Sequence, residues 1–173
     1  SKELGEIEKA ESYNNLAVSS LKNGKLDQAK TFIDQAMQID PIGKVGWTIM
    51  QLAAEDREQA DELILQQIQL LKTMVLSTES FIRAYTDIQM AVFPHPIFDV
   101  GRNRQIPHSS ANTAKIFLDF TLNRMIDFEK NQPGIMGEHR ATLKSLWLPI
   151  NQYAPELISN WQWLEQITRG SNK

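Results

Sequence analysis

Histidine and cysteine, the residues that most often hold metals or act as nucleophiles, provide this chain with little chemistry. Its three histidines are His95, His108 and His139, and the adjacent Glu138 and His139 lack the second histidine one helical turn away that a helical zinc site needs. The chain has no cysteine, which excludes disulfides, thiolate nucleophiles and cysteine-ligated zinc. The sequence therefore predicts no metal, no cofactor and no catalytic residue in this chain on its own.

Glycine and serine form no catalytic or phosphate-binding motif. Gly134 and Gly137 flank Ile-Met in a turn and Gly101 stands alone, so no glycine-rich phosphate loop is present. No Gly-x-Ser-x-Gly element occurs in the sequence. The serine pairs at 19–20 and 109–110 have no histidine and acid beside them, and helix capping or small-residue packing explains them better.

Two arginines are candidates for binding an anion. Arg102 and Arg104 stand on an expected loop beside Asn103 and Gln105, where a guanidinium can hold a phosphate or carboxylate through two parallel hydrogen bonds. The alternative is a solvated loop tip. The arginines therefore remain partner-binding candidates for an anionic group.

The tryptophans are candidates for a stacking surface. Trp47, Trp147, Trp161 and Trp163 could stack on a sugar or a peptide, whereas packing in the core is the alternative. Trp161 and Trp163 cannot share one helical face. Because Trp161 falls on the apolar stripe of its helix, we expect Trp163 to be the more exposed of the two.

Length and charge limit the function classes. The 173 residues suffice for one compact domain, and the formal net charge of -3 argues against bulk binding to nucleic acid or to an anionic membrane. The longest uncharged apolar run, 88–98, contains two prolines and falls short of the roughly 20 residues of a membrane-spanning helix. Because the chain starts with Ser1, we expect it to be a piece of a longer protein, which would touch a membrane only through its absent part.

Hydrophobic periodicity predicts an all-α fold, because no segment alternates in steps of two residues. Ser77 with Ser80, or alternatively Thr78, is expected to cap one helix, and Ser109 or Ser110 another. The loop 93–110 is long for a compact domain and carries several large apolar residues, so we expect it to pack partly on the helices. The expected helical segments are 10–41 as a hairpin, 43–54, 56–75, 79–92, 111–130, 138–148 ended by Pro149, and one from 155, with 131–137 as a turn.

The segment 10–41 has the most regular pattern in the chain. Apolar and small residues recur at three- and four-residue spacing on both expected helices, and the small ones among them allow the two backbones to approach closely. Gly24 falls between the helices, and Asp40 with Pro41 ends the second one. The patterned positions are Tyr13, Leu16, Ala17, Ser20, Ala29, Ile33 and Ala36.

These positions resemble a tetratricopeptide repeat, with Ser20 standing where an aromatic residue is usual. Trp47 and Met50 suggest a second, degenerate repeat after it. The resemblance implies a single helical domain over 1–173, with tetratricopeptide-like hairpins at 10–76 and a C-terminal helical cap or bundle at 77–173. It also implies a non-catalytic scaffold that binds a protein or peptide on its inner surface. The residues placed there, next to Glu11, are Asn14, Val18, Leu21 and Lys22.

A second resemblance concerns the layout of the chain. One such hairpin, followed by helices and a proline-aromatic loop with Arg102 and Arg104, resembles the soluble C-terminal part of bacterial O-antigen polymerase and ligase-type membrane glycosyltransferases. This implies a periplasmic accessory domain that contacts an anionic lipid-linked glycan or an acceptor protein, with the catalytic residues in membrane loops absent here. Interaction module and enzyme accessory domain both stay open.

Overall fold

The computed structural model describes residues 2–95 and 105–170, and these form nine α-helices and two short 3-10 helices without a strand. The predicted all-α fold is confirmed. In chain order the helices are α1 (Lys2–Lys22), α2 (Leu26–Ile39), α3 (Gly46–Glu55), α4 (Arg57–Lys72), α5 (Thr78–Val92), α6 (Ala111–Asn131), η1 (Ile135–His139), α7 (Arg140–Ser145), α8 (Trp147–Tyr153), η2 (Pro155–Leu157) and α9 (Ile158–Gly170).

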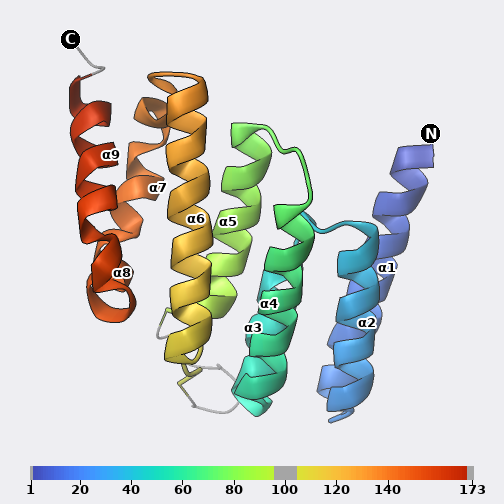
Figure 1. Cartoon of the computed structure of the whole chain (residues 1–173). Helices are drawn as coiled ribbons and strands as arrows, with labels where there is room; N and C mark the ends of the chain where they lie inside the picture. Colours follow the sequence, from blue (N-terminus) through green and yellow to red (C-terminus); the bar gives the residue numbers. More distant parts are fainter. Residues whose placement is uncertain (1, 96–104, 171–173) are drawn as a thin grey trace. The chain divides into compact units, whose positions relative to one another are not determined.

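The chain divides into two compact units, Ser1–Thr113 and Ala114–Lys173, with the boundary inside α6. In the first unit the helices form two layers, because α3 contacts both α1 and α5 while α2 contacts α4. Figure 1 shows α2 and α4 standing in front of α1 and α3. Short connections join the successive helices from α1 to α5, which run in opposite directions, as in other helical hairpins.

The hairpin predicted at 10–41 is present as α1 and α2. Gly24 lies in the turn with φ of +69°, a conformation that glycine adopts without a Cβ clash. Ala17, Ala29 and Ile33 are completely buried, so small side chains let the two helices pack closely as expected. The Tyr13 ring stacks on Phe32 with 6.2 Å between the ring centroids.

Two large residues at patterned positions of the predicted repeats lie outside the core. Leu16 is 46% exposed, because α1 turns Ala10 and Ala17 toward its neighbours. Trp47 is 48% exposed, because α3 buries the adjacent Gly46 and Thr48 instead. The predicted periods were right for both helices, and Ala17, Ser20 and Met50 are buried, but the buried faces exclude Leu16 and Trp47.

Polar side chains begin several helices of the first unit as the sequence indicated. Ser77 accepts a hydrogen bond from the backbone N–H of Ser80 at 3.1 Å. Of the two serines before α6, Ser110 makes the cap, with its Oγ accepting from the Thr113 N–H at 3.2 Å. These contacts satisfy N–H groups that the first turn of a helix leaves without a partner.

The described part of the 93–110 segment packs on the helices as predicted. Pro94 and Ile106 are buried and Phe93 is half-buried. The Ser109 N–H donates to the Val92 carbonyl at 2.9 Å, which joins the end of α5 to the start of α6. Ile97, Phe98 and Val100, which were also expected to pack there, lie outside the described residues.

The second unit differs from its expected outline in two places. The turn after α6 leads at Ile135 into the 3-10 helix η1, and α7 follows only at Arg140. Pro149 does not end a helix as predicted but lies in the first turn of α8, where its missing N–H costs no helical hydrogen bond. The Glu129 carboxylate fixes the turn, accepting from the N–H groups of Gly134 at 2.7 Å and Met136 at 3.0 Å.

Candidate binding groove

A groove of about 780 Å³ opens in the first unit, with α1 on one side, α5 on the other and the loop between α2 and α3 along it. Its size falls within the range of ligand-binding pockets in proteins. Apolar and polar side chains alternate over its surface. The lining residues are Ile7, Ala10, Glu11, Asn14, Asn15, Asp40, Ile42, Gly43, Lys44, Ile82, Arg83, Thr86, Asp87 and Met90.

The α5 wall is fixed by a close crossing with α3. Gly46 is buried at the first turn of α3, and a Cβ on it would lie 2.0 Å from the main-chain oxygen of Asp87. The Gly46 N–H also donates to Asp87 Oδ2 at 2.9 Å. A side chain at position 46 would force the two helices apart, so glycine permits this crossing and the groove wall beside it.

Asp87 is a partly buried carboxylate in this wall. Burial raises its pKa from 3.8 to about 6, although the N–H groups of Gly46 and Val45 and the positive charge of Lys44 act in the opposite direction. Asp87 therefore changes its charge between weakly acidic and neutral pH.

Asn14 supplies a second oriented polar group on the α1 wall. Its Oδ1 accepts a hydrogen bond at 2.7 Å from the hydroxyl of Thr48, which is completely buried in α3. With the carbonyl oxygen held by Thr48, the amide NH₂ remains as a donor. Helix α3 thus orients one polar side chain on each wall of the groove.

The rim of the groove combines charge with apolar surface. Glu11 on α1 and Arg83 on α5 are exposed and stand on opposite walls. Ile7 is 42% exposed and Met90 is 37% exposed, so large apolar groups face solvent beside these charges. The arrangement suits a ligand that has both apolar and polar groups.

Only part of the predicted partner-binding set lies in this groove. Asn14 lines it, together with Glu11, whereas Val18, Leu21 and Lys22 stand farther along α1 and do not. Val18 and Leu21 are half-buried and Lys22 is exposed. Arg102 and Arg104 lie outside the described residues.

The α5 wall was missed in the sequence. Arg83, Asp87 and Met90 fall between the apolar positions used to predict this helix, and their spacing resembles that of any solvated helix face. Gly46 could have indicated that another element packs closely here, since a glycine inside a helix often marks a close approach of another backbone. The sequence does not identify the residue that approaches it, because Asp87 is 41 positions away.

A second hollow, of about 620 Å³, lies over α2 and α4. It is a weaker candidate because its charged residues, Lys30 and Glu62, already form an ion pair with each other. The rest of its lining consists of Leu65, Leu70, Thr73, Gln38, Gln66 and Gln69.

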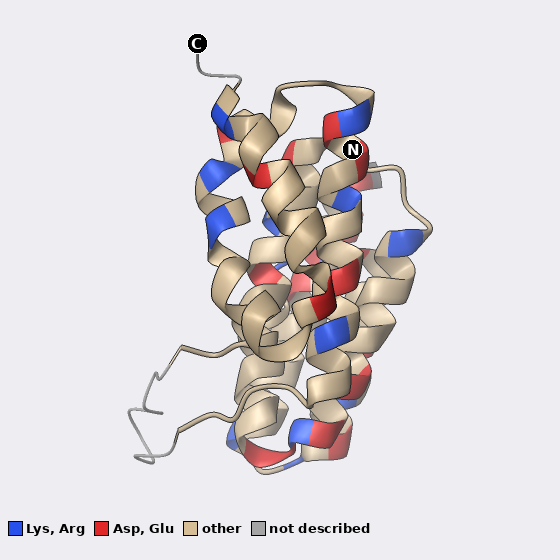
Figure 2. Cartoon of the chain, turned by 60° about the vertical axis from the view of Figure 1, so that its left-hand side comes forward, with Lys and Arg blue, Asp and Glu red and all other residues tan. Residues whose placement is uncertain are grey.

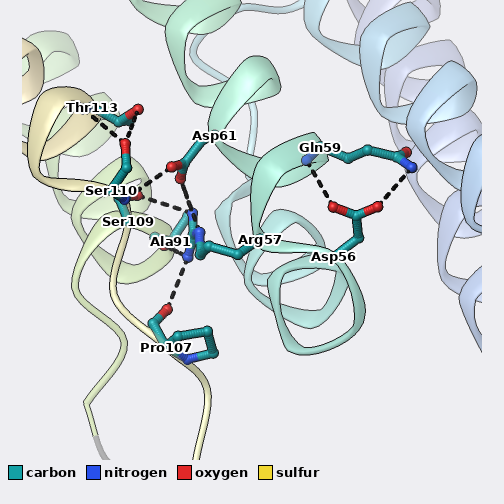
Figure 3. A network of polar contacts seen from close by, with 9 residues as sticks. All are labelled: Asp56, Arg57, Gln59, Asp61, Ala91, Pro107, Ser109, Ser110 and Thr113. Carbon is teal, nitrogen blue, oxygen red and sulfur yellow. Dashed lines mark hydrogen bonds and ion pairs between the residues drawn. The ribbon is translucent and has the colours of Figure 1, made fainter.

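A polar cluster centred on Arg57 connects α4, α5 and the start of α6. Its guanidinium donates to Asp61 Oδ1 at 2.9 Å, the Ala91 carbonyl at 2.9 Å, the Pro107 carbonyl at 3.1 Å and Ser109 Oγ at 3.0 Å (Figure 3). Burial lowers the pKa of Arg57, and the charge of Asp61 opposes this shift. Because the guanidinium is occupied by protein acceptors, we interpret the cluster as a structural junction.

The tryptophans of the second unit agree with the prediction for their helix. Trp163 is 41% exposed, whereas Trp161 is half-buried and donates through Nε1 to the Leu143 carbonyl at 2.8 Å. Trp147 and Trp161 pack with 4.6 Å between their ring centroids. This contact holds α8 against α9, and the rings of Trp147 and Trp163 remain exposed.

Charge and hydropathy add two observations. Figure 2 shows acidic and basic residues interspersed along the helices, in line with the small net charge of the chain. Within residues 2–95 and 105–170, no helix is long and apolar enough to cross a membrane, and no group of three potential metal-binding His, Asp or Glu side chains occurs.

Comparison of the chain with protein-family models, with curated proteins and with solved structures gives no match. The resemblance to tetratricopeptide repeats therefore stays a prediction from the residues at 10–41. The same holds for the resemblance to O-antigen polymerases and ligases.

Proposed function

We propose that this chain is a non-catalytic interaction module of tetratricopeptide type, whose groove between α1 and α5 binds a segment of a partner protein. The observation that carries the proposal is the groove itself, which combines exposed apolar side chains with polar groups held in position from α3. A polypeptide segment offers the matching combination of apolar side chains and main-chain hydrogen-bonding groups.

Preorganisation supports this proposal. The Thr48 hydroxyl fixes Asn14 and the Gly46 N–H fixes Asp87, so both groups are already oriented before a partner arrives. Binding then loses less conformational entropy than it would with freely rotating side chains. The partner can gain hydrogen bonds at two defined points and apolar contact around them.

The lining of the groove favours binding over chemistry. It includes no histidine, serine or cysteine, and its one hydroxyl, on Thr86, donates to the Ile82 carbonyl at 2.8 Å. A nucleophile with an adjacent base is thus missing from these residues. The groove residues can orient a ligand without reacting with it.

The test uses a phage-displayed peptide library selected against the full chain, followed by affinity measurements with the selected peptides. Asn15→Trp places a large ring on the groove wall, and we expect it to weaken binding about tenfold or more, equivalent to about 1.4 kcal/mol. Ser19→Trp, one turn along α1 and outside the groove lining, is the matched control and should bind as the natural chain does. Equal affinity of both variants, or selection of no peptide at all, would contradict the proposal.

A further inference from the structure

Among the described residues, the carboxylate of Asp87 is in direct contact with no positively charged side chain. Its Oδ2 accepts from the Gly46 N–H, but no lysine or arginine of the described segments forms an ion pair with it. Lys44 acts on it only from a distance, and its side chain is exposed on the neighbouring loop. The carboxylate is therefore removed from much of the solvent without a compensating cation.

Burying a carboxylate without a counter-charge costs free energy, which an incoming cation recovers in part. A lysine or arginine side chain is suited to this position, because its aliphatic stem can lie on apolar surface while its charged end reaches the carboxylate. Ile82 and Met90, on the same wall as Asp87, provide such surface.

The other charged groups around the groove are compatible with a lysine or arginine of the partner binding Asp87. Arg83 lies one turn before Asp87 on α5 and is exposed, and Glu11 stands on the α1 wall. On the connecting loop, Asp40 adds a third carboxylate, and Lys44 lies on the same loop. The lining thus holds carboxylates on both walls and on the loop, and an additional positive charge is complementary to them.

We propose that the groove takes a peptide segment carrying a lysine or arginine among apolar residues, and that this basic side chain pairs with Asp87. The inference rests on the proposed function, because it names the chemistry of the segment that the groove binds. Only the ionised carboxylate attracts the cation, so protonation of Asp87 releases the segment. The partner then binds at neutral pH and dissociates on acidification.

The test repeats the peptide selection with a library free of histidine, aspartate and glutamate. The selected peptides are then synthesised with blocked termini, so that only the protein titrates in the range used. We expect lysine or arginine to be enriched among the peptides selected at about pH 7.5, and their affinity to fall about tenfold by about pH 5, one unit below the pKa of about 6 of Asp87. Asp87→Asn should lose this pH dependence and the preference for basic residues. Asp27→Asn, an exposed carboxylate on α2 outside the groove lining, is the matched control and should retain both.

Circular dichroism of each variant establishes that it is folded. Asp87→Glu is a second variant, which keeps the negative charge and should therefore keep the preference for basic residues. Two outcomes would overturn this inference while leaving the proposed function intact. The first is that peptides weakened by Asn15→Trp carry no lysine or arginine, and the second is that they bind with equal affinity at both pH values. Selection of no groove-dependent peptide would overturn both.

Discussion

Asp87 makes the stability of the first unit depend on pH. Its pKa is raised by burial from 3.8 to about 6, so the folded chain binds a proton that the unfolded chain releases in this range. The stabilisation is complete below about pH 4 and is lost as the pH rises through about 6. The carboxylate that we propose as a binding group is thus destabilising at neutral pH while the groove is empty, as is common for groups at functional sites.

Replacing Asp87 by asparagine should stabilise the chain above pH 6. Asparagine can still accept the Gly46 N–H through its Oδ1 but carries no charge to bury, so we expect a gain of about 1–3 kcal/mol near pH 7 that disappears toward about pH 4. Urea unfolding at several pH values measures this difference. A variant that is less stable than the natural chain at neutral pH would show that the carboxylate's hydrogen bonds outweigh the cost of burying it.

Single residues also show where interpretation of the sequence reaches its limit. The capping serine Ser77 and the turn glycine Gly24 were predicted correctly, because capping and turn formation depend on residues close in sequence. Leu16 and Trp47 were misplaced, because the period of a helix does not determine which of two adjacent apolar faces is buried.

Among the elements, α3 supports both walls of the groove, although none of its residues lines it. It contacts both α1 and α5, and its residues Gly46 and Thr48 hold the polar groups of the two walls. The sequence indicated this helix, but its pairing with α5 depends on a contact between distant residues. One wall of the candidate site was therefore predictable in part, through Asn14, and the other was not.

Gly46→Ala should destabilise the chain although alanine is the better helix former. The added Cβ would meet the main chain of Asp87 at 2.0 Å, and moving two packed helices apart should cost about 1–3 kcal/mol. The matched control is Gly5→Ala in α1, whose Cβ meets nothing within 4 Å and which should gain up to about 1 kcal/mol from helix propensity. Thermal unfolding followed by circular dichroism compares the two, and equal midpoints would contradict the close crossing.

On the scale of the whole molecule, each of the two compact units contains a buried polar anchor of its own. Arg57 connects α4, α5 and the start of α6 in the first unit, and Glu129 fixes the turn after α6 in the second. The sequence analysis identified neither anchor, because a charged residue on a helix usually faces solvent. Both side chains form hydrogen bonds with main-chain groups, and the pattern of residue types along the sequence does not predict such bonds.

Glu129→Gln should loosen the second unit without affecting the first. The amide NH₂ of glutamine cannot accept the hydrogen bond that one carboxylate oxygen accepts, so either Gly134 or Met136 loses its partner at a cost of about 1–3 kcal/mol. We expect faster hydrogen exchange over 132–139 and unchanged exchange in α1 to α3. Asp127→Asn, an exposed change on the same helix, is the control, and loss of protection in α1 to α3 would show that the units unfold together.

The groove combines buried residues that support its walls with exposed residues on its rim, and this division affects how its binding preference can evolve. Gly46 and Thr48 are buried and determine the fold, whereas Asn15, Lys44 and Arg83 are exposed and contribute little to packing. Substitutions on the rim can therefore alter partner preference with little loss of stability, while the supporting residues tolerate few alternatives. A lineage can diversify what this groove recognises without redesigning its scaffold, and an engineer can recode it by the same route.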